Sequence, residues 1–214
     1  MNAASSTRAE RLRKRSAERR EQQKVDTRRA ILDAATTLFL KQGFEKFSLR
    51  QVAEAIGYSA TTIYLYFEDK DDLLYHVAIE GFKRFGEMLK TAYASSEEPL
   101  GRLKAIGQAY VQFGLENPVH YRLMFMQRGE FLQREPPEGY ESVIDSFGIL
   151  TQTIRECLAA GLIKEGEVMT YAAMVWSTVH GIVSLSISTP YFERAAVPVI
   201  LERSQDMIVN GIRR

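Results

Sequence analysis

Apolar residues recur every three or four positions from residue 26 to about residue 210, which is the spacing of one face of an α-helix. Segments in which apolar and polar residues alternate, as they do in half-buried strands, are almost absent from the sequence. Glycine and proline stand mainly where the apolar repeats stop, and these are the places where helices begin or end. The pattern therefore predicts an all-α fold.

The first part of this pattern predicts a long helix followed by a short one. The long helix covers residues 27–42, and Gly43 stands where a left-handed C-terminal cap is needed. Ser48 and Gln51 have the S-x-x-Q spacing of a capping box, which begins the short helix, and Gly57 ends it. We therefore expect the chain to turn at Gly57.

A third helix is predicted directly after this turn. Ser59 can cap it, and Ile63 with Phe67 forms its buried side. Two short helices joined by a glycine turn, directly after a longer helix, form the pattern of a helix-turn-helix. The outer side of the third helix is polar and aromatic but uncharged, which suits contact with phosphates and base edges. It consists of Thr61, Thr62, Tyr64 and Leu65.

The rest of the chain predicts six more helices. Asp69 and Asp72 bracket the first turn of a long one, where carboxylates interact well with the positive end of the helix dipole, and we expect this helix to connect two domains. Asn117 and Pro118 are a cap and a first-turn proline, and residues 129–139 form the one clear loop in this part. The six helices are predicted at residues 70–94, 99–116, 118–125, 140–160, 166–188 and 197–210.

The composition indicates a soluble protein without catalytic or metal-binding motifs. Apolar residues make up 45% of the chain, and no uninterrupted apolar stretch approaches the roughly 18 residues that cross a bilayer, so we expect a cytoplasmic protein without membrane contact. The single cysteine, Cys157, is predicted to be a buried, reduced thiol. His76, His120 and His180 are far apart in the sequence, and no H-E-x-x-H motif or glycine-rich phosphate loop occurs. We therefore expect no enzymatic activity, no metal and no cofactor.

Charge is distributed unevenly along the chain. The formal net charge is +1, but residues 1–25 carry eight basic and three acidic residues, a net charge of +5. This basic arm (residues 1–25) has almost no apolar residues, so we expect it to be flexible in the free protein. Two interpretations remain open: the arm contacts the minor groove or the phosphates of DNA, or it is a solubilising tail.

The run from Ala30 to Leu74 closely resembles the DNA-binding domain of the tetracycline-repressor (TetR) family, over about a quarter of the chain. The shared motifs are the glycine-aromatic exit from the first helix, the S/T-x-x-x-[IV]-A core, the G-x-S turn, the T-[IL]-Y-x-[YH]-F helix and the K-[DE]-x-L start of the next helix. Here they are Gly43 and Phe44, Ser48 to Ala53, Gly57 to Ser59, Thr62 to Phe67, and Lys70 to Leu73. More weakly, Trp176, His180 and Gly181 resemble the W-x-x-x-H-G signature of one subgroup of the family's C-terminal domains.

The resemblance implies which residues meet double-stranded operator DNA. Arg50 matches a position that reads a guanine in some members, and a bidentate arginine is the commonest specific contact to that base. Ala60 cannot donate a hydrogen bond, and Leu65 either packs on a thymine methyl or sugar or is plain surface. The resemblance places the third helix in the major groove and neighbouring residues on the DNA backbone. The full set of expected DNA-contacting residues is Ser48, Arg50, Ser59, Ala60, Thr61, Thr62, Tyr64, Tyr66 and Lys70.

The resemblance also implies a homodimer and a domain division. Because each short recognition helix makes few contacts with DNA, specificity requires two copies of the protein on a palindrome. The expected domains are the flexible basic arm (1–25), a helix-turn-helix domain (26–72) and an effector-binding and dimerisation domain (73–214), whose last two helices pair with those of a second copy. The expected interface residues, part of which can instead face the subunit's own core, are Ala172, Val175, Val179, Ile182, Val183, Val199 and Ile208.

In the family the C-terminal domain usually holds a small molecule among its central helices, and binding pivots the connecting helix so that DNA is released. For this chain the resemblance implies a small apolar or amphipathic effector. Aromatic residues at helical spacing also occur in ordinary cores, and a histidine beside a tryptophan is often structural. The candidate wall residues are Phe82, Phe85, Tyr110, Phe113, Tyr121, Met124, Phe125, Phe147, Met174, Trp176 and His180.

One alternative function shares the same N-terminal motif. It is a DNA-binding protein without a small-molecule effector, controlled by a protein partner or acting as an occlusion factor on chromosomal sites. A cavity in the C-terminal domain would favour the effector, whereas a fully packed domain would favour the alternative. Repression is the commoner outcome in the family, and activation stays open.

Overall fold

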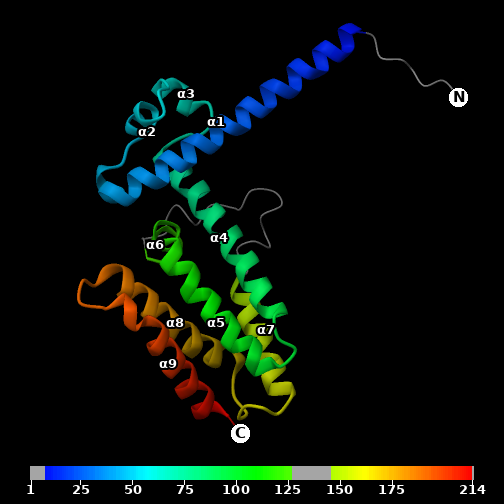
Figure 1. The fold of residues 1–214 in the computed structure, drawn as a ribbon, viewed down its shortest axis with the longest axis vertical. Helices are drawn as coiled ribbons and strands as arrows, with labels where there is room; N and C mark the ends of the chain where they lie inside the picture. Colours follow the sequence, from blue (N-terminus) through cyan, green and yellow to red (C-terminus); the bar gives the residue numbers. More distant parts are fainter. Residues whose placement is uncertain (1–7, 127–145, 214) are drawn as a thin grey trace, which may run out of the picture. The chain divides into compact units, whose positions relative to one another are not determined.

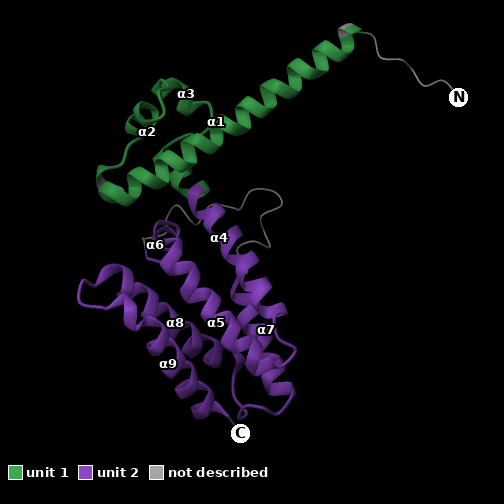
Figure 2. Ribbon diagram, viewed as in Figure 1, with its two compact units in different colours: residues 1–76 green, residues 77–214 purple. Residues whose placement is uncertain are grey.

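The structure, a computed structural model, describes residues 8–126 and 146–213 (Figure 1). These residues form α-helices, one short 3-10 helix and a single antiparallel bridge between Ile163 and Arg213. The predicted all-α class is confirmed. The chain divides into two compact units, Met1–His76 and Val77–Arg214 (Figure 2), so that the border between the units falls inside a helix. The expected domain bounds, 26–72 and 73–214, stay a prediction.

Unit 1 contains three helices and the start of a fourth. They are α1 (Arg8–Lys46), α2 (Leu49–Ala55), α3 (Ala60–Tyr64) and the first residues of α4 (Lys70–Ala94). The helices are held together by one small apolar core, to which each contributes fully or almost fully buried side chains. This core includes Ile31, Leu32, Ala35, Phe39, Val52, Ala53, Ile63, Phe67, Leu73 and Leu74.

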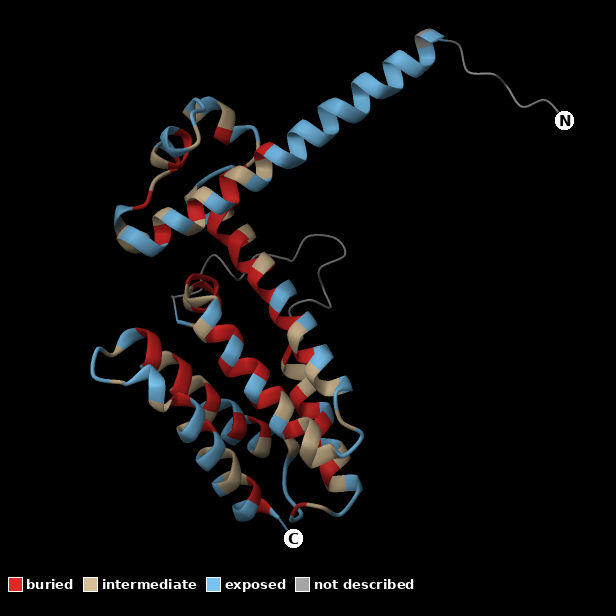
Figure 3. Cartoon of the chain, in the orientation of Figure 1, coloured by how far each residue is buried: buried red, intermediate tan, exposed pale blue. Residues whose placement is uncertain are grey.

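The basic arm is helical from Arg8 onward, and its expected flexibility in the free protein stays a prediction. From Arg8 onward the arm continues α1 as a helix, and every described side chain before Thr27 is exposed (Figure 3). Arginine, lysine, glutamate, glutamine and alanine are good helix formers. Because the arm extends a helix that is already anchored by Ile31 and Leu32, it does not need to nucleate a helix of its own.

Unit 2 is a bundle arranged around α5 (Pro99–Glu116), which packs against α6 (Pro118–Phe125), α7 (Ser146–Ala159), α8 (Val168–Ser188) and α9 (Val197–Ile212). A 3-10 helix, η2 (Arg194–Ala196), precedes α9. The predicted ends of α4 and α5 agree with the structure to the residue. The predicted loop at 129–139 and the predicted helix start at 140–145 lie outside the described residues.

Two glycines allow close helix approaches in unit 2. A Cβ atom at Gly114 of α5 would overlap the side chain of Val183 in α8. A Cβ atom at Gly81 of α4 would lie 2.6 Å from the sulfur of Met124 in α6. Neither position leaves room for a larger residue unless the neighbouring side chains shift.

A polar cluster ties α4, α5 and α7 together. Arg102 Nη1 lies 2.8 Å from Glu156 Oε2, and the Tyr93 hydroxyl donates a hydrogen bond to Glu156 Oε1 (2.5 Å). The hydrogen bond from Tyr93 is the main reason why the pKa of Glu156 is lowered. Next to Glu156 in the sequence, Cys157 is completely buried, and burial raises the pKa of its thiol to about 11.

Among the described residues, α8 is the one helix whose length and composition would suffice to cross a membrane. It packs against α5, α7 and α9. Ala172, Val175, Val179, Ile182 and Val183 are buried on its inner side, while its opposite side is exposed (Figure 3). The apolar character of α8 therefore has two sources. One side of the helix is buried in the core, and the other side is an exposed surface of apolar and small residues.

Candidate DNA-binding surface and ligand cavity

The candidate DNA-binding surface is formed by α2, α3 and the turn between them. Ser48 caps α2, since its hydroxyl oxygen accepts a hydrogen bond from the Gln51 amide (3.3 Å), and Ser59 caps α3 by accepting from the Thr62 amide (3.2 Å). The turn contains Gly57 at a φ of 72°, a left-handed value that other residues adopt only at a cost. Local capping and one glycine thus set the direction in which α3 leaves the turn.

One side of α3 anchors it and the other faces solvent. Ile63 is fully buried, whereas the Tyr64 and Leu65 side chains, which follow it, are 59% and 77% exposed. Thr61 is exposed, and Thr62 is half-buried with its hydroxyl 3.0 Å from that of Ser59. Leu65 is a large apolar side chain exposed to solvent; a single exposed apolar residue is common on protein surfaces, so both a DNA contact and plain surface fit it.

The remaining expected DNA-contacting residues lie on the same unit. Arg50 is exposed on α2, and its Nε atom lies 3.2 Å from Glu54 Oε1. An exposed pair of this kind holds its arginine weakly, by at most about 1 kcal/mol. Ala60, Tyr66 and Lys70 are half-buried, and Ser48 is half-buried with its hydroxyl engaged at the cap. Their contacts with DNA stay predictions.

Unit 2 contains a partly open apolar cavity of about 320 Å³ between α4, α5, α6, α7 and α8. Among the lining residues that the structure describes, six are aromatic, and every other one except Ser146 is an aliphatic residue or glycine. The described lining residues are Phe82, Phe85, Leu89, Ile106, Gly107, Tyr110, Phe125, Ser146, Phe147, Leu150, Val175, Trp176 and Val179. A volume of this size lies at the lower end of the range for small-molecule sites.

The cavity includes six of the wall residues expected from the sequence: Phe82, Phe85, Tyr110, Phe125, Phe147 and Trp176. The other five lie elsewhere. Phe113, Tyr121 and Met124 are buried in the packed part of the unit, and Met174 faces solvent with 47% of its surface exposed. His180 belongs to a polar cluster beside the cavity.

Sequence reasoning missed the aliphatic walls and Ser146. Leu89 lies one helical turn beyond Phe85 on α4, so helical spacing could have indicated it. Nothing in the sequence marks Ser146, which is a single serine at the start of α7.

Four side chains form the polar cluster beside the cavity. The Trp176 indole N–H donates to the Tyr110 hydroxyl (3.1 Å), which lies 3.0 Å from the Tyr121 hydroxyl. Nδ1 of His180 lies 2.7 Å from the Tyr121 hydroxyl and 3.3 Å from that of Tyr110. These groups satisfy one another, which a buried polar group requires.

Burial shifts the pKa values of this cluster toward the neutral forms. It raises the pKa of Tyr110 to about 12 and raises that of Tyr121 still further. It lowers the pKa of His180, so that the imidazole is neutral at pH 7. The cluster therefore carries no charge under ordinary conditions.

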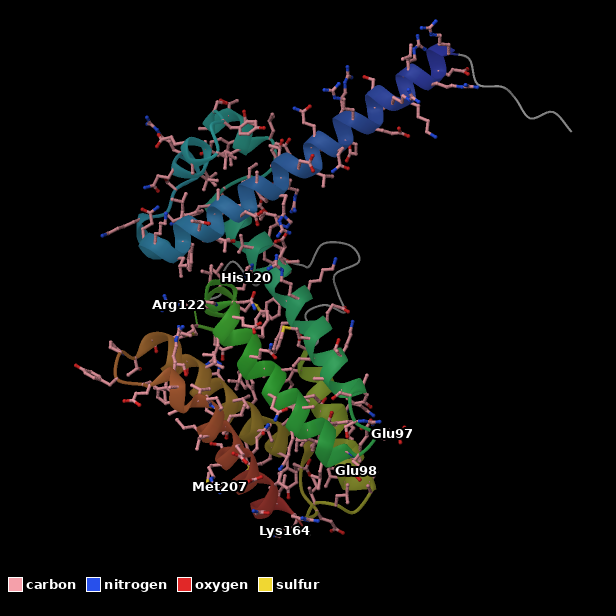
Figure 4. All side chains as sticks on the ribbon, in the orientation of Figure 1. Glu97, Glu98, His120, Arg122, Lys164 and Met207 are labelled. Atoms are coloured by element: carbon pink, nitrogen blue, oxygen red, sulfur yellow. The ribbon has the colours of Figure 1, made fainter. Side chains whose placement is uncertain are left out.

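The outer side of α8 and α9 is the third candidate surface. Along α8 it presents Ala173, Met174, Ser177, Leu185 and Ser188, and along α9 it presents Val199 and Met207, the last 71% exposed (Figure 4). At Gly181, in the middle of α8, an added Cβ atom would meet no other atom within 4 Å. The surface combines exposed apolar side chains with small residues that permit close approach of another helix, and Glu202 and Arg203 of α9 are exposed as well.

Five of the expected interface residues do not lie on this surface. Ala172, Val175, Val179, Ile182 and Val183 are all at least nine-tenths buried within the subunit. They face the subunit's own core, so their assignment to a dimer interface is corrected. The two expected residues on α9 differ: Val199 is exposed, and Ile208 is half-buried against the core cluster.

An exposed helix-turn-helix on a small helical unit, followed by a larger helical unit with a cavity, defines a class of DNA-binding transcriptional regulators. Residues 31–77 match the family model of bacterial regulatory proteins of the TetR family. Residues 103–209, half of the chain, match a model described as tetracyclin repressor-like, C-terminal domain. The chain belongs to the tetracycline-repressor family of transcriptional regulators, which is not a family of enzymes.

Individual relatives agree with this assignment. A helix-turn-helix transcriptional repressor from Mycobacterium tuberculosis is 36% identical over 86 residues, which are 40% of this chain and 43% of that protein. The match thus spans less than half the length of this curated relative.

Solved structures share the fold over most of both chains. A protein of unknown function from Rhodococcus sp. RHA1 is 26% identical, with a TM-score of 0.73 over 87% of this chain and 95% of the other. The fatty acid degradation regulator FadR from Bacillus halodurans is 17% identical, with a TM-score of 0.71 over 87% and 97%. The second likeness is one of fold alone.

Proposed function

We propose that this protein is a cytoplasmic, homodimeric repressor that binds a palindromic operator and leaves it when a small apolar or amphipathic molecule enters the cavity. The cavity is the observation that carries this proposal. An aromatic-lined space of about 320 Å³ is much larger than the voids of a packed core, which rarely exceed a water molecule.

The exposed side of α3 supports direct reading of a major groove. Tyr64 and Thr61 offer hydroxyl groups to phosphates or base edges, and Leu65 offers an apolar surface to a thymine methyl. Arg50 adds a flexible guanidinium on the neighbouring helix, held only by the exposed contact with Glu54.

The outer side of α8 and α9 supports dimerisation. Met174, Leu185, Val199 and Met207 expose apolar surface that a monomer would leave in water. Gly181 and the flanking serines allow the backbones of two α8 helices to come close. A second copy of the same surface would form a closed, two-fold interface, which matches the symmetry of a palindromic operator.

The cavity wall supports control by a ligand. Phe82, Phe85 and Leu89 of α4 line it, and the first residues of the same helix belong to unit 1. A ligand that displaces these three side chains moves α4, and it shifts the population toward a form with lower operator affinity only if it binds that form more tightly. Of the three residues that resemble the subgroup signature, Trp176, His180 and Gly181, Trp176 lines this wall.

The alternative, a regulator without an effector, would be favoured by a fully packed C-terminal unit. The cavity is the observation against it. Repression follows from the same surfaces if the operator overlaps a promoter.

The basic arm offers a further contact with DNA. Within α1, Arg13, Arg20 and Lys24 form one row along the helix, and Arg8, Arg15 and Arg19 form another, each with spacings of seven and four residues. An exposed row of this kind can follow phosphates that flank the operator.

Selection of bound fragments from random DNA tests the proposal. We expect a palindrome with half-sites about one helical turn or a multiple apart. Compounds are then screened for release of the protein from that palindrome. The proposal fails if no palindrome is enriched, and its effector part fails if no compound that binds unit 2 lowers operator affinity.

A further inference from the structure

One hydroxyl group in the cavity wall has no hydrogen-bond partner. Ser146 at the start of α7 lines the cavity, and only 8% of its surface is exposed. Its Oγ atom is buried and makes no hydrogen bond within the part of the chain that the structure describes. A buried hydroxyl without a partner carries the unfavourable free energy of its lost hydration, so native proteins rarely keep one unless something else satisfies it.

The other polar groups of the wall are already engaged. The Trp176 N–H donates to the Tyr110 hydroxyl, and that hydroxyl also lies within hydrogen-bond distance of Tyr121 and His180. A hydroxyl has one hydrogen to donate and two lone pairs, so these partners fill the capacity of Tyr110. Ser146 Oγ is therefore the one free hydrogen-bonding side-chain group among the described lining residues.

The described wall also carries no charge. All of its residues other than Ser146, Tyr110 and Trp176 are hydrocarbon side chains or glycine. A carboxylate or ammonium group that entered would lose its hydration without gaining an opposite charge, which is strongly unfavourable. The described part of the wall therefore disfavours ions.

The shape and lining indicate the size and type of molecule. An apolar cavity of about 150 Å³ takes up benzene, so about twice that volume suits a molecule with two fused rings. Phe82, Phe85, Phe125, Phe147 and Trp176 offer ring faces and edges to such a molecule, and aromatic pairs gain attraction beyond the area that they bury.

We infer that the cavity takes an uncharged aromatic compound of about two rings with one hydroxyl or carbonyl group, and that Ser146 Oγ binds that group. The inference rests on the proposed function and gives its effector a chemical class. Ser146 sets specificity, because its hydrogen bond makes a ligand with one polar group bind more tightly than a pure hydrocarbon of the same size.

Calorimetry with three probes on the full chain tests this inference. The probes are naphthalene, 2-naphthol and 2-naphthoate, which share the ring system and differ in the polar group. We expect 2-naphthol to bind more tightly than naphthalene, and 2-naphthoate to bind at least about tenfold more weakly than 2-naphthol.

Variants of Ser146 then assign the preference. Ser146→Ala should weaken 2-naphthol binding by roughly threefold to tenfold and leave naphthalene binding unchanged. Ser146→Thr keeps a hydroxyl and should keep the preference. Ser186→Ala is the matched control, because Ser186 is equally buried but bonds to its own helix and does not line the cavity.

Several outcomes would overturn the inference. They are tight binding of 2-naphthoate, no binding of either neutral probe, equal weakening of both neutral probes by Ser146→Ala, or the same loss in Ser186→Ala. Operator affinity is measured on the same samples. If the neutral probes bind with the expected selectivity but DNA is not released, the ligand class stands and the effector function fails. If a charged compound releases DNA, the function stands and the ligand class fails.

Discussion

The Tyr121 hydroxyl and Nδ1 of His180 lie 2.7 Å apart, and their rings are stacked with centroids 5.7 Å apart. Tyr121 is on α6 and His180 is on α8, so this contact joins two helices beside the cavity. Because Tyr121 is completely buried, its hydroxyl depends on this contact and on the one to Tyr110 for all of its hydrogen bonds.

Removal of that hydroxyl should destabilise the protein. Tyr121→Phe leaves His180 and Tyr110 short of a partner, and we expect the free energy of unfolding to fall by about 1 to 2 kcal/mol. Urea unfolding at one fixed protein concentration measures it, since dimer stability depends on concentration. Tyr191→Phe is the control, because the Tyr191 side chain is 93% exposed. A decrease no greater than that of the control would contradict the expectation.

His180 should make stability depend on pH. Burial lowers its pKa in the folded state below the ordinary value of about 6.5. Below that value the unfolded chain binds the proton more readily, so the free energy of unfolding is highest above about pH 6.5 and decreases as the pH falls toward the folded-state pKa. Unfolding of wild type and His180→Gln between about pH 8 and pH 5 isolates this contribution. Equal decreases in both proteins would show that His180 does not cause it.

Arg50 should control specificity at one operator position. Arg50→Ala is expected to weaken binding by about 1 to 3 kcal/mol and to relax the preference for one guanine. Fluorescence anisotropy with the selected operator and with single-base variants measures both effects. Glu54→Ala is the paired control, since it removes the partner of Arg50 and a negative charge, and it should not weaken binding. Unchanged base preference in Arg50→Ala would assign the guanine contact elsewhere.

Charge on the outer side of α8 and α9 should separate the dimer. Leu185→Glu and Met207→Glu each place a carboxylate on the exposed apolar surface, and burying two such groups across a two-fold axis is strongly unfavourable. Light scattering should then give the mass of one 24.3 kDa chain in place of two. Leu40→Glu makes the same change at an exposed site in unit 1 and should leave the mass unchanged. Dimers that persist in both surface variants would place the interface elsewhere.

The basic arm should contribute to the salt dependence of DNA binding. Deletion of residues 1–24 is expected to reduce the slope of log K against log salt by roughly 0.9 for each phosphate that the arm neutralises in the intact protein. The two rows of α1 provide matched variants of equal charge: Arg13, Arg20 and Lys24 to Gln, or Arg8, Arg15 and Arg19 to Gln. Only substitution of the row that faces DNA should reduce the slope of log K against log salt strongly. An unchanged slope after deletion would identify a solubilising tail.

Helix ends could be predicted where a local chemical signal sets them. Asp69 directly before α4, whose side chain accepts a hydrogen bond from the Asp72 amide, and Pro99 at the start of α5 fix the boundaries through capping and backbone geometry, which act within a few residues. The start of α1 could not be predicted in this way, because the polar composition of the arm indicates disorder by itself. Its helix depends on the anchored segment that follows.

The faces of α8 show the limit of hydrophobic spacing. Ala172, Val175 and Val179 repeat as core residues do, and the sequence cannot tell whether the core belongs to one subunit or two. The cavity is a similar case. Large aromatic residues indicated much of its wall. The role of Ser146 depends on its hydroxyl having no hydrogen-bond partner, and that is visible only in three dimensions.

The deep burial of Cys157 has a practical consequence for following α3 in solution. Because the only native sulfhydryl is enclosed in α7 and stays protonated well above neutral pH, thiol reagents will scarcely react with it. A new cysteine at an exposed site such as Tyr64 would therefore take up a spin label selectively, without any prior mutation. In a two-fold assembly one such site yields a pair of labels. The distance between the two labels would report directly how effector binding changes the separation of the two α3 helices.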